Sequence, residues 1–119
     1  MGLTHLRVKI ANPAQPRKTA EAKFLIDSGA VYSVVPGTCL KQLGIKPHSK
    51  KVFTLANGET IERGVGDALF QYDDHRGSSP VVFGEPGDST LLGAVTLEAL
   101  GVILDPLRRK LKPLPMLLA

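Results

Sequence analysis

The chain has no tryptophan and a single cysteine, Cys39, among its 119 residues. One cysteine excludes an internal disulfide framework, so nothing in the sequence requires an oxidising compartment. The sequence also lacks an apolar run of 18 residues and a charged-then-apolar leader, and these absences argue against a membrane span and a signal peptide. We therefore expect a soluble, cytoplasmic protein.

Motifs for metal ions and common cofactors are also missing. The three histidines lie far apart, and neither a His-x-His nor a Cys-x-x-Cys spacing occurs, so no zinc site is predicted. Gly64-Val65-Gly66 lacks the third glycine and the following helix of a dinucleotide-binding loop. Asp73-Asp74 is typical of a solvated turn. Cys39 has no histidine motif to pair with, so we interpret it as a packing thiol.

The charge of the chain is modest and dispersed. Fifteen lysines and arginines against eleven acidic residues give a net charge of +4, and the basic residues fall in small groups. The four phenylalanines and two tyrosines are not interleaved with arginine, as a stacking platform for bases would require. No nucleic-acid partner is therefore expected. A basic, RNA-associated β domain remains an alternative, and it predicts steeply salt-dependent binding to RNA.

Length and composition indicate one mostly β domain over residues 1–119. A hydrophobic content of 43% and a charged content of 22% are ordinary for a folded domain. A chain of this length buries enough surface for one core. Twelve glycines and nine prolines, without long polar helices, indicate a turn-rich β protein.

Alternation of apolar and polar residues predicts the strands. Leu6, Val8 and Ile10 alternate with basic residues, residues 20–26 alternate likewise after a proline-rich loop, and the two segments are predicted to form a hairpin. Asn57-Gly58 predicts a second, projecting hairpin, because both residues tolerate positive φ. Its predicted arms are residues 52–56 and 59–65. The remaining predictions are strands at residues 67–72, 80–84 and 102–104, a polar turn at 73–77, a helix at 38–43 capped by Thr38 and ended by Gly44, and a helix at 96–100 ended by Gly101.

One segment carries chemistry, because an aspartate follows an apolar strand and precedes small residues: Phe24-Leu25-Ile26-Asp27-Ser28-Gly29-Ala30. The apolar residues before Asp27 place its carboxylate low in the structure, where it needs hydrogen bonds or a partner. Ser28 supplies a donor nearby, and Gly29 brings a bare backbone amide close. An Asx-turn at the end of a strand has the same local pattern.

The order of several motifs resembles the retropepsin-like aspartic proteases of clan AA, and in particular their small, single-lobe prokaryotic members. Asp27-Ser28-Gly29-Ala30 follows an apolar strand, a glycine-tipped hairpin comes next, and Leu91-Leu92-Gly93-Ala94 follows about 60 residues later, before a short helix and a strand. The resemblance covers nearly the whole chain. It implies a mostly β, closed, barrel-like lobe with one or two short helices, active as a C2 homodimer.

The resemblance also implies an activity and a role for each matched residue. The chain holds one Asp-Ser-Gly motif, so each subunit would contribute one Asp27 to a dyad that activates water for peptide-bond hydrolysis. No metal or organic cofactor would take part. Ser28, Gly29 and Ala30 would support the dyad and line the cleft. The hairpin at residues 52–66 would close over the peptide as a flap, and the residues contacting substrate would include Asn57, Gly58, Leu91, Leu92 and Gly93.

Some features depart from the viral members of this family. Those members often have acidic residues soon after the first motif and an arginine after the later glycine, where this chain has Val31-Tyr32 and Ala94. Their inter-chain contacts and substrate preferences therefore do not carry over. The C-terminal strand expected at the dimer interface falls within residues 110–118, a proline-rich segment. The alternative function is a non-catalytic dimer of the same fold that binds extended peptides in its cleft.

Overall fold

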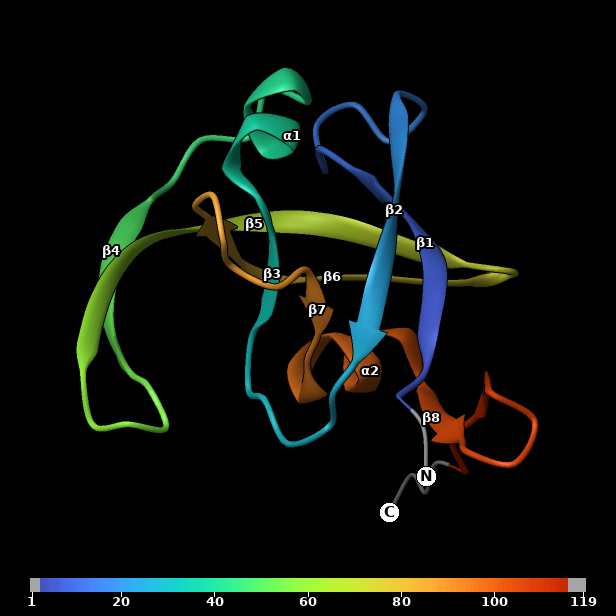
Figure 1. Cartoon of the computed structure of the whole chain (residues 1–119). Helices are drawn as coiled ribbons and strands as arrows, with labels where there is room; N and C mark the ends of the chain where they lie inside the picture. Colours follow the sequence, from blue (N-terminus) through green and yellow to red (C-terminus); the bar gives the residue numbers. More distant parts are fainter. Residues whose placement is uncertain (1–2, 116–119) are drawn as a thin grey trace, which may run out of the picture.

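The computed structural model describes residues 3–115, and most of this part of the chain is β-strand (Figure 1). Two short helices complete it. In chain order the elements are β1 (His5–Ala11), β2 (Thr19–Ile26), β3 (Ser33–Pro36), α1 (Gly37–Gln42), β4 (Ser49–Thr54), β5 (Thr60–Tyr72), β6 (His75–Gly84), β7 (Leu91–Leu92), α2 (Ala94–Leu100), β8 (Val102–Asp105) and β9 (Lys110–Pro113). No helix within residues 3–115 is long and apolar enough to cross a membrane.

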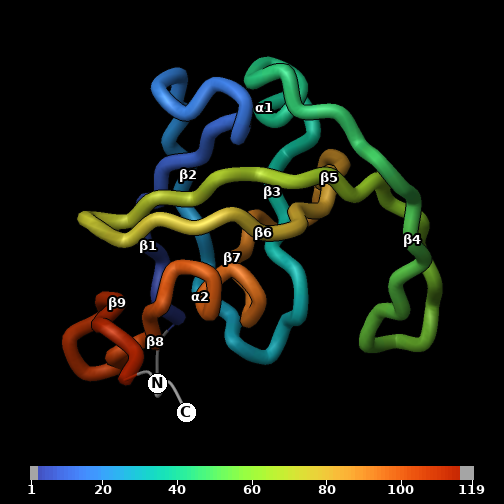
Figure 2. Tube along the Cα trace, turned by 180° about the vertical axis from the view of Figure 1, so that it is seen from behind, coloured from blue at the N-terminus to red at the C-terminus, as the bar shows by residue number. Residues whose placement is uncertain are grey.

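Seven strands form one sheet that closes on itself. The strand order is β1-β2-β7-β3-β6-β5-β4, and β1 also pairs with β5. That extra pairing joins the two sides of the sheet into a barrel-like lobe, which the tube in Figure 2 shows from behind. Among the strands within residues 3–115, β4 pairs only with β5, and it therefore extends outside the closed part. The predicted mostly β, closed lobe with one or two short helices is confirmed.

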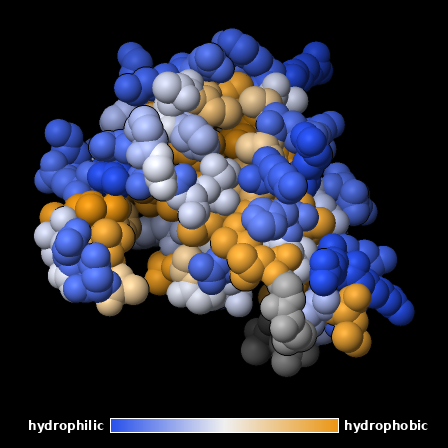
Figure 3. Space-filling view, viewed as in Figure 1, coloured by the Kyte–Doolittle hydropathy of each residue, from blue (hydrophilic) through white to orange (hydrophobic). Residues whose placement is uncertain are grey.

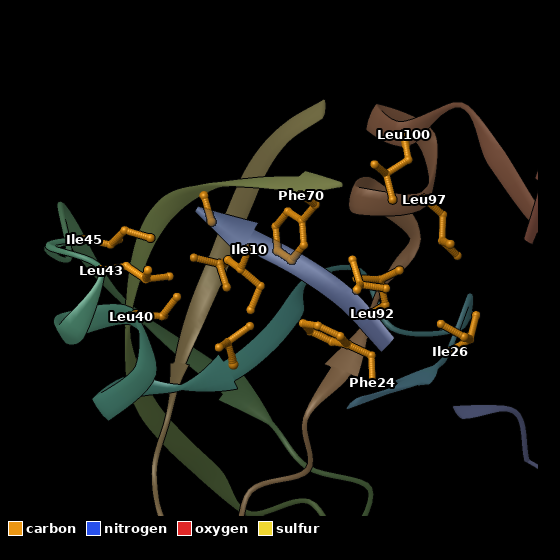
Figure 4. Packing of buried hydrophobic residues seen from close by; sticks show 14 of the residues in the cluster. Ile10, Phe24, Ile26, Leu40, Leu43, Ile45, Phe70, Leu92, Leu97 and Leu100 are labelled. Carbon is orange, nitrogen blue, oxygen red and sulfur yellow. The ribbon is translucent and has the colours of Figure 1, made fainter. Parts of the chain in front are cut away.

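The core fills the inside of the closed sheet, because the alternating strands turn their apolar faces inward. Phe24 from β2 and Phe70 from β5 meet edge to face, with ring centroids 6.1 Å apart. Leu92 from β7 and Leu97 and Leu100 from α2 continue the cluster toward α2, on the right of Figure 4. This packing fixes the end of β2, where Asp27 follows, against β7.

The β4–β5 hairpin projects from the lobe, at the left of Figure 1. Its arms pair from Ser49↔Val65 to Thr54↔Thr60, so the predicted projecting hairpin is confirmed, with a first arm that begins and ends earlier than predicted, at Ser49–Thr54. Of the two turn residues, Asn57 and Gly58, only Gly58 has a positive φ, of 88°. Asn57 instead accepts a hydrogen bond from the Glu59 N–H through its side-chain oxygen, at 2.9 Å.

Two local predictions need correction, and a third is confirmed. The polar turn predicted at residues 73–77 is limited to Asp73 and Asp74, because the β5–β6 ladder continues to Tyr72↔His75. Thr38 does not cap α1, which begins at Gly37 after Pro36 without a side-chain cap. The predicted glycine ends are confirmed, since Gly44 and Gly101 have φ values of 78° and 71°.

The predicted C-terminal strand lies partly within the described chain. Lys110–Pro113 forms β9, which pairs antiparallel with β8 in a separate two-stranded sheet. Pro113 is at the end of this pair, opposite Val102, where a missing N–H is tolerated. Leu114 and Pro115 continue without strand pairing, and residues 116–118 of the predicted segment lie outside the described residues.

Candidate active site

Asp27 stands at the end of β2, at the point where the strand leaves the sheet. Its backbone N–H donates to the Leu92 carbonyl at 2.9 Å, which extends the parallel pairing of β2 with β7. Asp27 is half-buried, and its Oδ1 accepts a hydrogen bond from the Gly29 N–H at 3.0 Å. The Ala30 N–H donates to the Asp27 carbonyl at 3.2 Å. The loop therefore holds the carboxylate in one orientation.

The loop after Asp27 is joined to the start of α2. The Ala94 N–H donates to the Ala30 carbonyl at 2.7 Å, and the Val95 N–H donates to the Val31 carbonyl at 3.1 Å. These two amides belong to the first turn of α2, where no carbonyl of the helix can accept them. The loop thus supplies the missing acceptors. As a result, the two sequence motifs form one unit although they are far apart in the chain.

Gly93 sits where the two motifs approach most closely. A Cβ at this position would lie 2.7 Å from the Tyr32 oxygen and 2.9 Å from the Ala30 oxygen, both of them backbone atoms. Real Cβ atoms essentially never come this close to other heavy atoms, so only glycine fits here. The Leu-Leu-Gly motif is therefore explained by the space beside the Asp27 loop.

A buried chain of hydroxyl groups supports this junction from behind. The Gly93 N–H donates a hydrogen bond to Ser33 Oγ at 2.9 Å, and Ser33 Oγ is hydrogen-bonded to Thr96 Oγ1. Thr96 Oγ1 is hydrogen-bonded in turn to Ser79 Oγ at 2.7 Å, and the Ser79 hydroxyl donates to the Pro80 carbonyl at 3.3 Å. Ser33, Ser79 and Thr96 are all buried. The network ties β3, β6 and α2 together.

Replacing Thr96 by valine tests this network, because valine keeps the shape and removes the hydroxyl. Ser33 and Ser79 would each lose a partner, and a buried polar group left without one costs about 1–3 kcal/mol. We expect the free energy of unfolding to fall by about that amount in chemical denaturation. Thr38→Val, an exposed change in α1, is the control and should leave stability nearly unchanged. Equal stability of the two variants would contradict the structural role of the network.

A groove lies between the β4–β5 hairpin and the Asp27 loop. Its volume is about 450 Å³, and Figure 3 shows hydrophobic atoms on the hairpin at the lower left, beside a hollow in the surface. Ala30 and Leu91 place this groove next to Asp27. The groove is lined by Ala30, Val31, Tyr32, Val34, Phe53, Thr54, Leu55, Ile61, Arg63, Val82, Asp88, Ser89 and Leu91. Such a space is suited to an apolar side chain of a bound molecule.

An ion pair closes one side of the groove. Arg63 of β5 donates to both carboxylate oxygens of Asp88, from Nε at 2.8 Å and from Nη2 at 3.1 Å. Its Nη1 also lies 3.6 Å from Glu85 Oε2. The hydrogen bond from Arg63 holds the pKa of Asp88 below its usual value, against the opposing effect of burial. This pair joins the base of the hairpin to the loop that leads into β7.

The Arg63–Asp88 pair predicts a dependence of stability on pH. The pKa of Asp88 is lower in the folded protein than in the unfolded chain. The pair therefore stabilises the fold at pH values above the pKa that Asp88 has in the unfolded chain. This contribution is lost as the pH falls through the lower pKa that Asp88 has in the folded protein. Asp88→Asn should therefore lower the Tm by a few degrees at pH 7. The difference from wild type should shrink toward pH 3. Glu98→Gln, an exposed change in α2, is the control, and a pH-independent difference for Asp88→Asn would contradict this assignment.

The predicted site residues fall into three groups. Asp27, Gly29, Ala30, Leu91 and Gly93 lie together where the Asp27 loop meets β7 and the start of α2, and of these five only Ala30 and Leu91 line the groove. Leu92 is fully buried in the core and does not line the groove. Ser28 is exposed, as are Asn57 and Gly58 at the hairpin tip. Among residues 3–115, none of these three lines the groove, and near the hairpin tip Leu55 lines it instead. Also within residues 3–115, no group of three or more potential metal ligands occurs.

Sequence reasoning missed the two polar networks. Ser33 had a signal, because it lies two residues before Val35 in a β-branched segment and therefore shares the inward face of the strand with it. Arg63 and Asp88 had none, because their partnership joins residues 25 positions apart through the fold.

Two comparisons with known proteins indicate which family the chain belongs to. A search of curated proteins found no match. Residues 7–97 match the sequence model of a family described as aspartyl protease. The solution structure of the simian foamy virus (mac) protease is similar over 79% of this chain and 91% of that chain, with a TM-score of 0.56 and 21% sequence identity. The family match includes both motifs of the junction. The chain therefore belongs to the aspartyl protease family and has a retropepsin-like fold.

Proposed function

We propose that the protein is an aspartic endopeptidase whose active site forms between two identical chains. The observation that carries this proposal is the half-buried Asp27, whose carboxylate accepts a hydrogen bond from the Gly29 amide and whose loop contributes Ala30 to the lining of an apolar groove. Family membership supports the same activity. The substrate would be an extended peptide or a segment of a protein, with the scissile bond over Asp27.

The reaction needs two carboxylates, and one chain supplies one Asp-Ser-Gly motif. A two-fold axis beside Asp27 would place the second copy opposite the first. Ser28 is exposed and is free to bond the partner's backbone beneath the dyad. Val31, directly after the motif, has an exposed fraction of 62%, which is apolar surface that a second subunit would cover.

In this dimer the chemistry follows from the charge of the pair. Two carboxylates about 3 Å apart cannot comfortably both ionise, so they retain one proton over an acidic range of pH. The ionised carboxylate takes a proton from a water held between them, and the water oxygen attacks the scissile carbonyl carbon. The protonated carboxyl donates a hydrogen bond to the carbonyl oxygen as it becomes tetrahedral. Activity should therefore follow a bell-shaped pH profile.

The β4–β5 hairpin would act as the flap over the bound peptide. Phe53, Leu55 and Ile61 line the groove from the hairpin side, so closure would remove water from around the scissile bond. The Arg63–Asp88 pair sits at the base of this hairpin and would hold its arm in place during closure.

A dimer that binds peptides without cleaving them would use the same groove and hairpin. The intact Asp-Ser-Gly motif argues against this alternative, because a binding module has little reason to place paired carboxylates in its cleft.

The test is cleavage of a diverse peptide library between about pH 3 and pH 8. We expect cleavage with a bell-shaped pH profile and, at low enzyme concentration, a rate that rises with the square of that concentration. A folded, dimeric protein that binds peptides and cleaves none of them at any pH would overturn the proposal in favour of the binding module.

A further inference from the structure

The groove has a cationic edge beside its apolar centre. In the β4–β5 hairpin, Lys51 pairs with Arg63. Two residues further along β4, Phe53 pairs with Ile61. Because side chains alternate along a strand, these four residues share the face of the hairpin that looks onto the groove. Lys51 Nζ lies 5.7 Å from the centre of the Tyr32 ring.

Aromatic contacts hold this edge in place. The Tyr32 and Phe53 rings meet edge to face, with centroids 6.2 Å apart, and both residues line the groove. The Lys51 ammonium group therefore sits beside the apolar space, on the side that Tyr32 forms. The tyrosine ring attracts the ammonium group without neutralising its charge.

The two cations on this face differ in their partners. Arg63 is paired with Asp88 and lies near Glu85, so its charge is already compensated. Lys51 forms no ion pair with a carboxylate among residues 3–115. Its three N–H donors remain available to an anionic group. An acidic side chain of a bound peptide would complement this charge.

We infer that the groove selects peptides in which an acidic residue lies within three positions of a large apolar residue. The apolar side chain occupies the groove under Phe53 and Ile61, and the acidic side chain pairs with Lys51 over Tyr32. Successive side chains of an extended peptide are about 3.3 Å apart, so one peptide can reach both places. This inference rests on the proposed peptide-binding function of the groove and names its substrate class.

The test compares peptides that differ only in having Glu, Gln or Lys at the positions around one Phe. Cleavage by wild type is measured as kcat/KM, and binding to the Asp27→Asn protein is measured by fluorescence anisotropy of the same labelled peptides. We expect wild type to favour the Glu peptide over the Gln peptide by about 3- to 10-fold. Lys51→Glu should abolish that preference and favour the Lys peptide instead.

Lys50→Glu is the matched control, because it makes the same change of charge one residue away on the opposite face of the strand. It should keep the preference for Glu. The inference is overturned if Lys51→Glu leaves the Glu preference intact, or if Lys50→Glu removes it equally. If no peptide is cleaved, the proposed catalytic function fails, and the anisotropy ratios still decide the role of Lys51.

Discussion

Asp27→Asn should reduce peptide cleavage by about 10³-fold or more, because it removes from each active site both the general base and the shared proton. Asparagine has nearly the shape of aspartate, and its side-chain oxygen can still accept the hydrogen bond that Gly29 donates to Asp27 Oδ1. Folding and subunit association should therefore be preserved. The measurement is kcat/KM on the best library peptide, with circular dichroism and sedimentation to verify fold and assembly.

Asp74→Asn is the control for this change. Asp74 lies at the β5–β6 turn with a side chain that is 95% exposed, so the same substitution there should leave kcat/KM within about twofold of wild type. An Asp27→Asn protein that is folded and still cleaves at the wild-type rate would exclude Asp27 as a catalytic residue.

Gly93→Ala is expected to lower the free energy of unfolding by about 3 kcal/mol or more, because the added Cβ overlaps backbone atoms that cannot move independently. Gly93 has φ −96° and ψ 179°, a conformation that alanine adopts readily. The cost therefore comes only from space. Relieving the overlap would displace the Ala30 carbonyl and weaken its hydrogen bond from Ala94.

Thermal unfolding measures this cost, and a drop in Tm of about 10 °C or more is expected. Gly87→Ala is the control, because Gly87 has a φ of 93° and a Cβ there meets nothing within 4 Å. That change should cost about 1–2 kcal/mol through backbone strain alone. Equal effects at the two positions would show that the close approach at Gly93 has no special importance.

The parts of the site that sequence could predict are those that short motifs encode. Asp27 with Gly29, and Leu91 with Gly93, occur in local patterns, and the spacing of the two motifs matched a known family. The position of Leu92 in the core could have been read from the same pattern, since adjacent residues of a strand face opposite sides. The hydroxyl chain through Thr96 and the pairing of Arg63 with Asp88 depend on distant segments meeting, which no local pattern records.

The fold shows the same division between local and distant causes. The centres of β1 and β2 were predictable because their apolar residues alternate. The start of β6 was missed, because the segment from His75 to Ser79 looks polar and turn-like until it is paired with β5. The residue at position 77 of that strand is glycine because the Ala99 backbone of α2 packs against it, where a Cβ would collide. Strand ends are thus set by their partners.

The most direct test of the shared active site is to mix wild-type chains with Asp27→Asn chains and measure cleavage. The variant is added in ninefold excess, at protein concentrations at which all chains are dimeric. If each active site needs Asp27 from both subunits, the activity per wild-type chain should fall about tenfold, because only about one wild-type chain in ten then has a wild-type partner. Activity per wild-type chain that does not change with added variant would contradict the account, because each chain would then carry a complete active site.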